Sequence, residues 1–382
     1  MSSRWLPRIS RGGGGGGGGG DHQTYRVIVG NELRGDTDDD CDILDPGDGS
    51  GLASALAAAS AGDDIFVRSG VYTLTDVTAP LAVPEGVRFI GAGEGGPLTA
   101  VGGGSPQTEI VGPSAGDQQI FTLAADSALE ELRITNPTPT AETSGGNSLV
   151  TATGGGQRIA RCTAFMQPNG AVSRTQLYFF SFADKSLVRI HQCNMFGVTG
   201  SQQQFTLTRG IFMTGVGAPA YITETVVEEF DDQVFLDGDN LAVSDGVFTA
   251  PANGRCIAVR PNQGAAQYRD VRITSCRFNG TGTSTCVVIS PSDAELRYCL
   301  IDNCVFVGVD NNDTGISVGT GLGVPITRAS VVRGCGFESF ALAAISIESS
   351  AENTILLANE MSQSPGKITN NSATTESAHN LV

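Results

Sequence analysis

Short runs of alternating apolar and polar residues recur along most of the chain. One frame starts with Ile, Val or Leu and has a small residue three positions later, and its copies are about 28 residues apart. The copies start at Ile134, Ile159, Ile190, Ile222, Val243, Ile273, Ile301, Val332 and Leu356. A second apolar strand precedes most copies, so each repeat is expected to hold two short strands separated by turns.

These repeats predict a solenoid of β-strands. No 3.6-residue period lies between the strands, which excludes the alternating strands and helices of an α/β fold. If each repeat is one coil, equivalent residues stack about 4.8 Å apart and inward positions form continuous apolar ladders. The predicted fold class is therefore all-β: a right-handed, single-stranded parallel β-helix of about 10 to 11 coils with an N-terminal capping helix.

Cysteine stands at one position of the frame in five copies. We expect Cys162, Cys193, Cys276, Cys304 and Cys335 to form a ladder in the core where the coil bends, because a thiol is small and apolar. Reduced thiols are the favoured interpretation, although stacked neighbours such as Cys276 and Cys304 could reach the separation that a disulfide needs. No Cys-x-x-Cys pair is present, so the sequence does not indicate a zinc site.

One helix is expected ahead of the repeats. Ser50 is a suitable N-cap, Leu52 and Leu56 lie one turn apart among alanines, and Gly62 supplies a stop. A solenoid leaves the core of its first coil open to water, so a short helix lying across this end would act as a cap.

Composition and charge exclude several classes of protein. The chain of 382 residues has 51 Gly and a formal net charge of −17. We expect no binding to nucleic acid, because phosphates need a basic face. No apolar run is long enough for a membrane span or a secretion signal, so we expect no membrane contact and reduced cysteines in a cytoplasm.

The first 24 residues differ from the rest. They hold the only Trp and three Arg without any acid before a run of nine Gly. The candidate partner-binding residues of this arm are Arg4, Trp5, Leu6, Arg8, Ile9 and Arg11. Trp and Arg dominate many interfaces, so the arm is expected to anchor the chain, with a disordered start as the alternative. The predicted organisation is an arm and tether over 1–24, an acidic segment over 25–48, the capping helix and β-helix over 49–370, and a tail over 371–382.

Residues 49–93 contain an Ala-rich helix followed by the motifs GDDIFVRSGVYTL and VPEGVRFIGAG. With the repeats, this segment resembles the pectate-lyase-like right-handed parallel β-helix superfamily, and the resemblance extends over about residues 25–365. It implies the fold. The superfamily includes polysaccharide lyases and hydrolases, phage tailspikes and catalytically inert virion proteins, so the resemblance leaves the activity open.

Four aspartates around one strand are the best candidates for catalysis: Asp231, Asp232, Asp237 and Asp239. The pair Asp231-Asp232 is similar to the Asp pair of the pectin-hydrolysing family, but the Gly-His and Arg-Ile-Lys motifs of that family do not follow. The Trp-Ile-Asp-His and Arg-x-Pro-x-x-Arg motifs of pectate lyases are also missing. We therefore expect a solvated acidic loop without catalytic residues, and catalysis by these aspartates is the alternative.

A second acidic run suggests a calcium site. Asp38, Asp40 and Asp42 match the first three ligand positions of an EF-hand loop. Ile43 and Gly49 stand where that loop needs Gly and Glu, so a solvated turn is favoured. We expect no other metal or cofactor.

These features predict a non-enzymatic phage virion structural protein, such as a capsid decoration or spike protein. The arm would bind a major capsid or other virion protein, the chain would be a homotrimer, and assembly would take place in the host cytoplasm. The alternative is a polysaccharide-binding or polysaccharide-cleaving enzyme similar to tailspikes and lyases, for which a surface glycan would be the partner.

Overall fold

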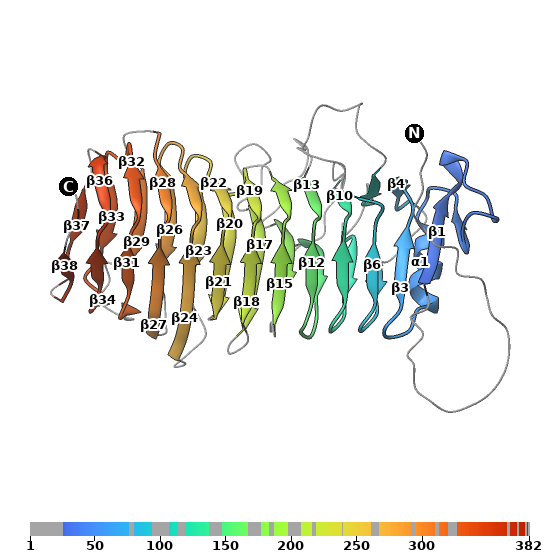
Figure 1. The fold of residues 1–382 in the computed structure, drawn as a ribbon, viewed down its shortest axis with the longest axis horizontal. Coiled ribbons are helices and arrows are strands. Elements are labelled where there is room, and N and C mark those ends of the chain that lie inside the picture. Colours follow the sequence, from blue (N-terminus) through green and yellow to red (C-terminus); the bar gives the residue numbers. More distant parts are fainter. Residues whose placement is uncertain are drawn as a thin grey trace.

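The backbone winds into a rod along which three parallel sheets run side by side (Figure 1). This computed structural model describes residues 26–75, 80–93, 107–113, 119–136, 147–166, 177–182, 187–197, 208–215, 219–238, 240–260, 267–291, 295–309, 313–319, 327–364, 367–372, 374–378 and 380. The prediction of an all-β parallel β-helix is confirmed, with 11 strands in each of two sheets.

We name the three sheets A, B and C in the order in which a coil passes through them. Sheet A consists of β1 (Arg26–Asn31), β2 (Ile43–Asp45), β3 (Asp64–Val67), β6 (Arg88–Ile90), β9 (Ala128–Glu130), β12 (Arg158–Ala160), β15 (Val188–His191), β18 (Ala220–Thr223), β21 (Leu241–Ser244), β24 (Gln267–Thr274), β27 (Glu295–Asp302), β30 (Thr327–Arg328), β31 (Val331–Arg333), β34 (Ala351–Glu352), β35 (Ile355–Leu357) and β38 (Glu376–Ala378). Sheet B consists of β4 (Gly70–Thr73), β7 (Thr108–Val111), β10 (Arg133–Asn136), β13 (Thr163–Met166), β16 (Asn194–Phe196), β19 (Val226–Glu228), β22 (Val247–Thr249), β25 (Arg277–Asn279), β28 (Val305–Val307), β32 (Gly336–Glu338) and β36 (Glu360–Gln363).

Sheet C consists of β5 (Leu81–Val83), β8 (Phe121–Leu123), β11 (Asn147–Ala152), β14 (Leu177–Phe182), β17 (Thr208–Gly215), β20 (Asp232–Gly238), β23 (Arg255–Val259), β26 (Thr285–Ile289), β29 (Thr314–Val318), β33 (Ala343–Ile347) and β37 (Ile368–Asn370). Each full coil therefore has three strands, one more than the two that the sequence pattern predicts. The strand that the sequence pattern does not predict is the one in sheet B. It follows the sheet A strand after only two residues, as between β9 and β10, so the two strands look like one in the sequence.

The corner between sheets A and B has the same backbone shape in successive coils. The first residue after the sheet A strand adopts a left-handed conformation with φ between 50° and 62°. The residues at this corner are Glu131, Arg161, Gln192, Glu224, Asp245, Ser275, Asn303, Gly334 and Ala358. A single left-handed residue turns the chain sharply, so the next side chain points into the core.

Cysteine occupies that next position in five coils. Cys162, Cys193, Cys276, Cys304 and Cys335 are each at most 2% exposed, and all nine cysteines of the chain are free thiols. Each of the five thiols donates a hydrogen bond to the carbonyl two residues earlier, over 3.2 to 3.4 Å. These thiols are parts of the core, and their carbonyl bonds satisfy a buried polar group at the bend.

Aromatic stacking extends the core toward the C-terminal end. Phe248, Phe278, Phe306 and Phe337 occupy one inward row of sheet B, and neighbouring rings are stacked with centroids 4.8 to 5.4 Å apart. Such contacts between coils add to the burial of apolar area that holds a solenoid together.

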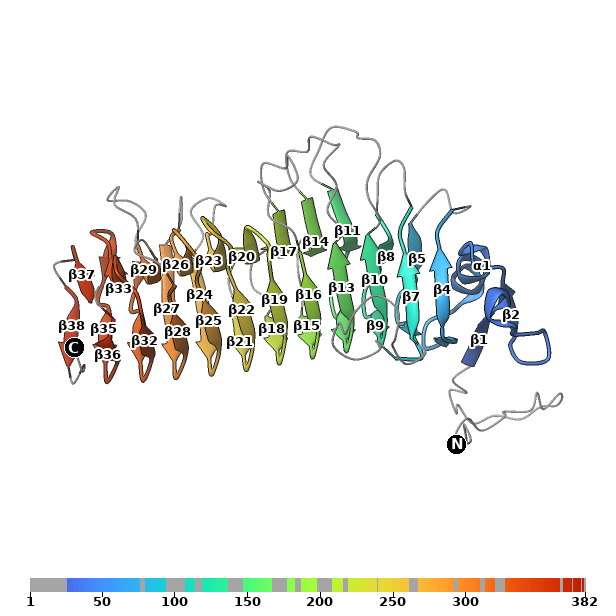
Figure 2. The same ribbon diagram turned by 90° about the horizontal axis from the view of Figure 1, so that it is seen from above.

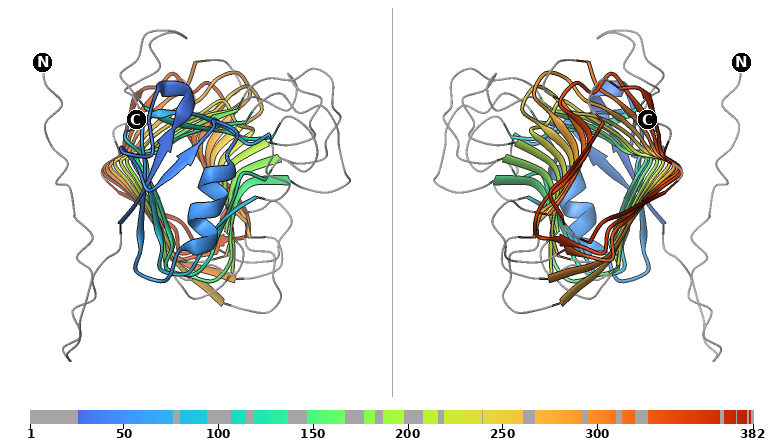
Figure 3. Two further views of the ribbon diagram at one scale, coloured as in Figure 1. Left: turned by 90° about the vertical axis from the view of Figure 1, so that its right-hand side faces the viewer. Right: turned by 90° about the vertical axis from the view of Figure 1, so that its left-hand side faces the viewer.

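Helix α1 (Ser50–Ala58) lies across the N-terminal end of the rod, where it covers the core of the first coils (Figure 3). Leu52, Ala55 and Leu56 are buried on its inner face. The capping helix is thus present, but its ends differ from the prediction. Its N-cap is Gly49, because the carboxylate of Asp45 accepts hydrogen bonds from the N–H groups of Gly47, Gly49 and Leu52. This carboxylate takes the role that was assigned to the Ser50 hydroxyl.

The helix also ends earlier than predicted, at Ala58, and the next residue is already extended. Gly62 belongs to the following turn, with a φ of 92°. The sheets reach beyond the predicted limits of the β-helix, 49–370: β1 and β2 come from the acidic segment, and β38 comes from the tail. No helix in the described part of the chain has the length and apolarity of a membrane span.

Candidate functional site

The outer face of sheet C carries an unusual set of side chains on β14, β17, β20 and β23, which lie side by side (Figure 2). The parallel register aligns Tyr178, Arg209, Asp232 and Arg255 in one row across these strands. A second outward row consists of Ser181, Phe212, Phe235 and Ala258. Residues between and beside these rows, such as Ile211, Met213 and Leu236, point into the core.

Three aromatic rings surround one guanidinium on this face. The Tyr178 and Phe212 rings stack at 4.6 Å, and the Phe212 and Phe235 centroids are 5.8 Å apart. The Arg209 guanidinium lies 3.7 Å from the centroid of Phe235 and 5.1 and 5.4 Å from those of Phe212 and Tyr178. We call Tyr178, Phe212 and Phe235 the ring cluster. Burial raises the pKa of the Tyr178 phenol, so it stays protonated.

Asp232 holds the arginines of this face in place. Its side chain is fully buried, with Arg209 Nε 3.2 Å from one carboxylate oxygen and Arg255 Nε bonded to the other. The two guanidinium groups hold this carboxylate in place through charge-assisted hydrogen bonds. Asp232 is therefore a positioning group, and water or a ligand has no access to it.

Asp231 makes a local contact with the preceding coil. Its carboxylate accepts hydrogen bonds from the Thr208 N–H at 2.7 Å and from the Thr208 hydroxyl at 3.0 Å. Asp231 thus ties the start of β20 to the start of β17. Asp231 and Asp232, the adjacent pair that suggested catalysis in the sequence, thus both make contacts with neighbouring strands of sheet C.

Asp237 and Arg260 lie at the other end of the two central strands. Asp237 is half-buried near the end of β20, beside Thr214 in the register. Arg260 directly follows β23 and is also half-buried. Burial lowers the pKa of its guanidinium, and the charge of Arg255 adds to that effect. Its Nε is buried without a hydrogen-bond partner.

The repeat provides an internal comparison for this face. Farther along sheet C, the first row continues as Thr285, Thr314 and Ala343, and the second as Val288, Ser317 and Ser346. These coils have the same backbone and register with small, mostly uncharged outward residues. The aromatic rings of the ring cluster and the arginines beside them are therefore not needed to build a coil. Their presence on β14, β17, β20 and β23 indicates a function of this face rather than a requirement of the fold.

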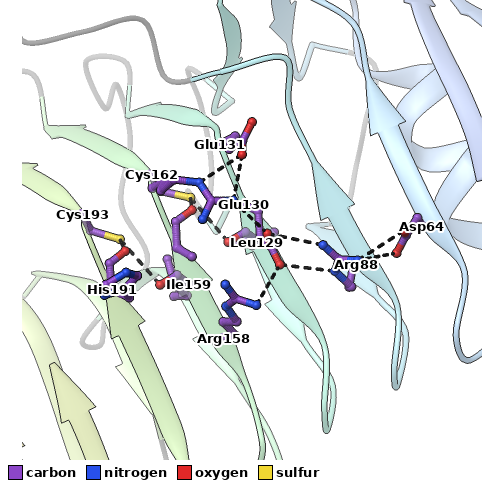
Figure 4. Close-up of polar contacts among 12 residues, drawn as sticks. Asp64, Arg88, Leu129, Glu130, Glu131, Arg158, Ile159, Cys162, His191 and Cys193 are labelled. Carbon is purple, nitrogen blue, oxygen red and sulfur yellow. Dashed lines mark hydrogen bonds and ion pairs between the residues drawn. The ribbon is translucent and has the colours of Figure 1, made fainter. Parts of the chain in front are cut away.

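A second cluster of charges lies on sheet A, around Glu130 (Figure 4). This carboxylate is 3% exposed, and its oxygens lie 3.2 to 3.6 Å from Arg88, Arg158 and Arg161. Asp64 contacts Arg88 at 3.3 Å, and Glu131 contacts Arg161 at 2.7 Å. Three carboxylates and three guanidinium groups balance, and each carboxylate has a partner, so this cluster is a structural network between coils.

The structure places the other predicted site residues away from the ring cluster or leaves them undescribed. Asp239 and the arm residues Arg4, Trp5, Leu6, Arg8, Ile9 and Arg11 lie outside the described residues. In the acidic segment, Asp40 accepts hydrogen bonds from Thr37, and Asp42 accepts one from the Ile28 N–H. Nowhere in the described ranges do three or more His, Cys, Asp or Glu residues gather as a metal site. Calcium at Asp38, Asp40 and Asp42, the homotrimer and the location in a virion stay predictions.

Sequence reasoning missed the ring cluster and its arginines, although the strands of Phe212, Phe235 and Ala258 were recognised; β14, which carries Tyr178, was not. Aligning the strands as Arg209-Gly-Ile-Phe212, Asp232-Gln-Val-Phe235 and Arg255-Cys-Ile-Ala258 would have shown the charged first position and the aromatic fourth position. Two adjacent residues in each strand, such as Val234 and its neighbour Gln233, are buried, so the strands do not follow the simple alternation of inward and outward residues. The alignment therefore becomes clear only when the register between the strands is known.

Comparisons with known proteins identify relatives by fold. No protein-family model and no curated protein matches the sequence. The catalytic unit of a thermostable GH87 α-1,3-glucanase from Streptomyces thermodiastaticus superposes with a TM-score of 0.55 and 12% identity, covering 94% of this chain and 71% of that one. The fold is a right-handed parallel β-helix.

A DFA-IIIase from Arthrobacter chlorophenolicus A6 in complex with DFA-III gives a TM-score of 0.52 and 11% identity, covering 86% of this chain and 94% of that one. The chain spans 64% of the catalytic domain of another GH87 α-1,3-glucanase, with a TM-score of 0.44 and 10% identity. At these identities the likeness shows a shared fold.

The prediction of a non-enzymatic phage virion protein is wrong. Two solved proteins that share the fold at TM-scores above 0.5 are a glucanase and a DFA-IIIase, and they favour the alternative that was kept beside it. That prediction depended on the arm, which lies outside the described residues, and on missing motifs of two enzyme families. A β-helix can carry other catalytic arrangements, so those missing motifs excluded too much.

Proposed function

We propose that the chain is a polysaccharide-processing enzyme that binds its substrate on the outer face of sheet C. The observation that carries this proposal is the ring cluster next to ionic groups, on a surface where neighbouring coils have small residues. Sugar rings have apolar C–H faces and polar edges, so they are bound by aromatic side chains together with a few fixed polar groups.

The direction of the rows suits a chain of sugars. Tyr178, Phe212 and Phe235 belong to three consecutive strands of sheet C, so the rings follow each other along the axis of the rod. Adjacent coils are about 4.8 Å apart, which is close to the length of a monosaccharide unit. A polysaccharide lying along the axis would therefore place successive sugars over successive coils.

Asp237 is the carboxylate that we assign to the chemistry. Cleavage of a glycosidic bond needs a group that protonates the leaving oxygen or activates water. Asp232 is fully buried between arginines, whereas Asp237 lies on the outer side of the same strand and is partly exposed. It lies beyond the ring of Phe235, where a sugar bound by the ring cluster would end.

The fold neighbours support this assignment of function. The glucanase and the DFA-IIIase are named for action on carbohydrates, and both share the β-helix over most of this chain. The superfamily resemblance of residues 49–93 agrees with them, because it includes lyases and hydrolases of polysaccharides.

Two assays with a panel of polysaccharides test the proposal: binding of each polysaccharide by the protein, and release of products from it. The panel contains α-1,3-glucan, inulin, a cellulose derivative and several polyuronates, and each is assayed for retardation of the protein and for new reducing or unsaturated ends. We expect Phe212→Ala to weaken retardation by the bound glycan about tenfold or more. The matched control is Ser317→Ala, which lies in the same outward row on a plain coil.

The same panel separates binding from chemistry. Asp237→Asn is expected to abolish product formation while retardation persists, and Glu338→Gln on the outer side of sheet B leaves both unchanged. If no glycan is bound in a way that depends on Phe212, the assignment of this face is wrong. If product formation survives in Asp237→Asn, another carboxylate carries the reaction.

A further inference from the structure

A smaller group of outward aromatic side chains lies on sheet B, which forms a different side of the rod from sheet C (Figure 3). Phe165 on β13 and Phe196 on β16 are paired in the register, and both side chains are half-buried. The residues before them, Ala164 and Met195, are fully buried, so the two phenylalanines belong to the outer face of the sheet. Two partly exposed rings therefore follow each other along the axis of the rod, one coil apart.

The repeat shows that these rings are not needed to build sheet B. The same outward row holds Thr135 in the coil before the rings, and Thr249, Asn279 and Val307 in later coils. Those strands keep the parallel register with smaller side chains. A partly exposed ring leaves apolar area in contact with water, which is unfavourable. The two rings on this face therefore indicate a contact with something outside the coil.

A fixed arginine lies beside the first of these rings. The Arg133 guanidinium is 5.8 Å from the centroid of Phe165, within the range of a cation–π contact. Its Nε lies 3.4 Å from an oxygen of Glu109, and the Thr135 hydroxyl donates a hydrogen bond of 2.6 Å to the same oxygen. Arg133 is thus held between a carboxylate of the preceding coil and a ring of the following coil.

The ring cluster on sheet C is built from the same parts. There Arg209 lies 3.7 Å from the centroid of Phe235 and contacts the buried carboxylate of Asp232 at 3.2 Å. On both sheets, an arginine that is fixed by a carboxylate lies over an aromatic ring of the outer face. Sheet B therefore repeats, with fewer rings, the arrangement to which we assign glycan binding.

The rings of the two sheets also lie on the same coils. The chain passes from β13 to β14 and from β16 to β17, so the coils that carry Phe165 and Phe196 also carry Tyr178 and Phe212. In the next coil, the half-buried Glu228 follows Phe196 in the outward row of sheet B. The concentration of rings on the same coils favours one kind of ligand for both faces.

We propose that Phe165 and Phe196 form a second binding surface for the polysaccharide that the site on sheet C processes. The inference rests on the function proposed above and adds a place where the polymer is bound without being cleaved. The two rings contact the apolar faces of successive sugars, and Arg133 and Glu228 at the ends of the row bind hydroxyl groups. A polymer that contacts both sheets is held more tightly than by either alone, because the second contact forms within one complex. A short oligosaccharide occupies one face at a time.

The first test compares a polymer with its own short fragments. The probe is the polysaccharide that retards the wild type most, chosen from α-1,3-glucan, inulin, a cellulose derivative and the polyuronates, together with short oligosaccharides prepared from it. Combining Phe165→Ala with Phe196→Ala should weaken retardation by the polymer about fivefold or more and raise its KM by a similar factor, while kcat and KM for the oligosaccharides change less than about twofold. The matched control is Thr249→Ala, which lies in the same outward row on a coil without a ring.

Binding in a Phe212→Ala background separates the two faces. The retardation that remains in Phe212→Ala should vanish when Phe196→Ala is added, because sheet B then holds the polymer alone. If the substitutions on sheet B change nothing in either background, the inference fails while the proposed function stands. If Phe212→Ala changes nothing and Phe196→Ala removes both binding and product formation, sheet B is the main site and both assignments are wrong. If no probe retards the wild type, both also fail.

Leucine variants and light scattering separate binding from a structural role of the rings. Phe165→Leu with Phe196→Leu keeps apolar side chains on the sheet, so the melting temperature should stay within about 3 °C of the wild type. The flat faces of the rings are lost, so retardation by the polymer should still fall about threefold or more. Retardation equal to that of the wild type would overturn the inference. A change of molecular mass in either double variant would also overturn it, because the rings would then belong to a contact between copies of the chain.

Discussion

Two clusters of arginines and carboxylates lie on the rod, and they differ in how deeply the central carboxylate and its arginines are buried. The cluster on sheet A consists of Asp64, Glu130 and Glu131 with Arg88, Arg158 and Arg161. In the cluster on sheet C, Arg209 and Arg255 share the fully buried carboxylate of Asp232. The arginines of the first cluster are 37 to 46% exposed, whereas those of the second are 11 and 22% exposed.

Their surroundings differ as well. The polar contacts of Glu130 are made with arginines on neighbouring coils (Figure 4). Arg209 lies among the three rings of the ring cluster. A network of ion pairs alone stabilises neighbouring coils, whereas charged groups held beside aromatic rings are suited to a ligand. The aromatic rings therefore separate a candidate site from a structural cluster on one repetitive scaffold.

The largest expected effect is the loss of Asp232. In Asp232→Asn the buried guanidinium groups of Arg209 and Arg255 lose the carboxylate that they share, so the free energy of unfolding should fall by about 3 kcal/mol. Urea unfolding in chloride measures the loss, and added sulfate should recover part of it by binding in place of the carboxylate. A loss smaller than that of Glu130→Gln would mean that the arginines of sheet C are better satisfied than the structure shows.

Glu130→Gln should have the next largest effect. The amide cannot neutralise three arginines, but Asp64 and Glu131 still pair with two of them, and water reaches all three. We therefore expect a loss of about 2 kcal/mol in the free energy of unfolding. Glu131→Gln is the control, with an exposed carboxylate and a loss below about 0.5 kcal/mol. Equal losses in the two variants would contradict the central place of Glu130.

Arginine substitutions compare the clusters from the cationic side. Arg161→Gln removes a guanidinium that bonds to both Glu130 and Glu131, so a loss of about 1 kcal/mol is expected. Arg260→Gln removes an unpaired cation, so the free energy of unfolding should stay within about 0.5 kcal/mol or increase. Thermal unfolding of both variants without ligand measures the difference. A large loss in Arg260→Gln would show that this arginine stabilises the fold.

The fold was predictable because a solenoid repeats its physical requirements. Inward Ile, Val or Leu returns once per coil, and Cys follows the left-handed corner in five coils, so nine weak signals add up to one strong one. The strands of sheet B and the true ends of helix α1 were not predictable in this way. A turn with one left-handed residue and a cap supplied by Asp45, five residues before the helix, leave little trace in local sequence.

The candidate site was less predictable for a different reason. It is made where the repeat is broken: no ring follows Phe235 in the later coils, where Ala258 and Val288 take its place, and Thr285 replaces the arginine after Arg255. The sequence showed the cluster of Asp231 and Asp232 but not that the first would bond to Thr208 and the second would be enclosed by arginines. Charge balance between coils depends on register, which emerges only with the fold.

The smallest expected effect concerns Asp302 and Arg333, which form a one-to-one pair on sheet A and give a baseline for both clusters. The hydrogen bond from Arg333 lowers the pKa of the Asp302 carboxyl. A carboxyl with a lowered folded-state pKa stabilises the fold fully above its unfolded pKa of about 3.9, and this contribution is lost as the pH falls through the folded value. Unfolding of the wild type and Asp302→Asn should therefore differ by a constant amount between pH 5 and 7, a range chosen about one unit above that pKa. The difference should shrink below about pH 4, and a difference that persists at about pH 3 would mean that the amide is unfavourable at this position for reasons other than charge.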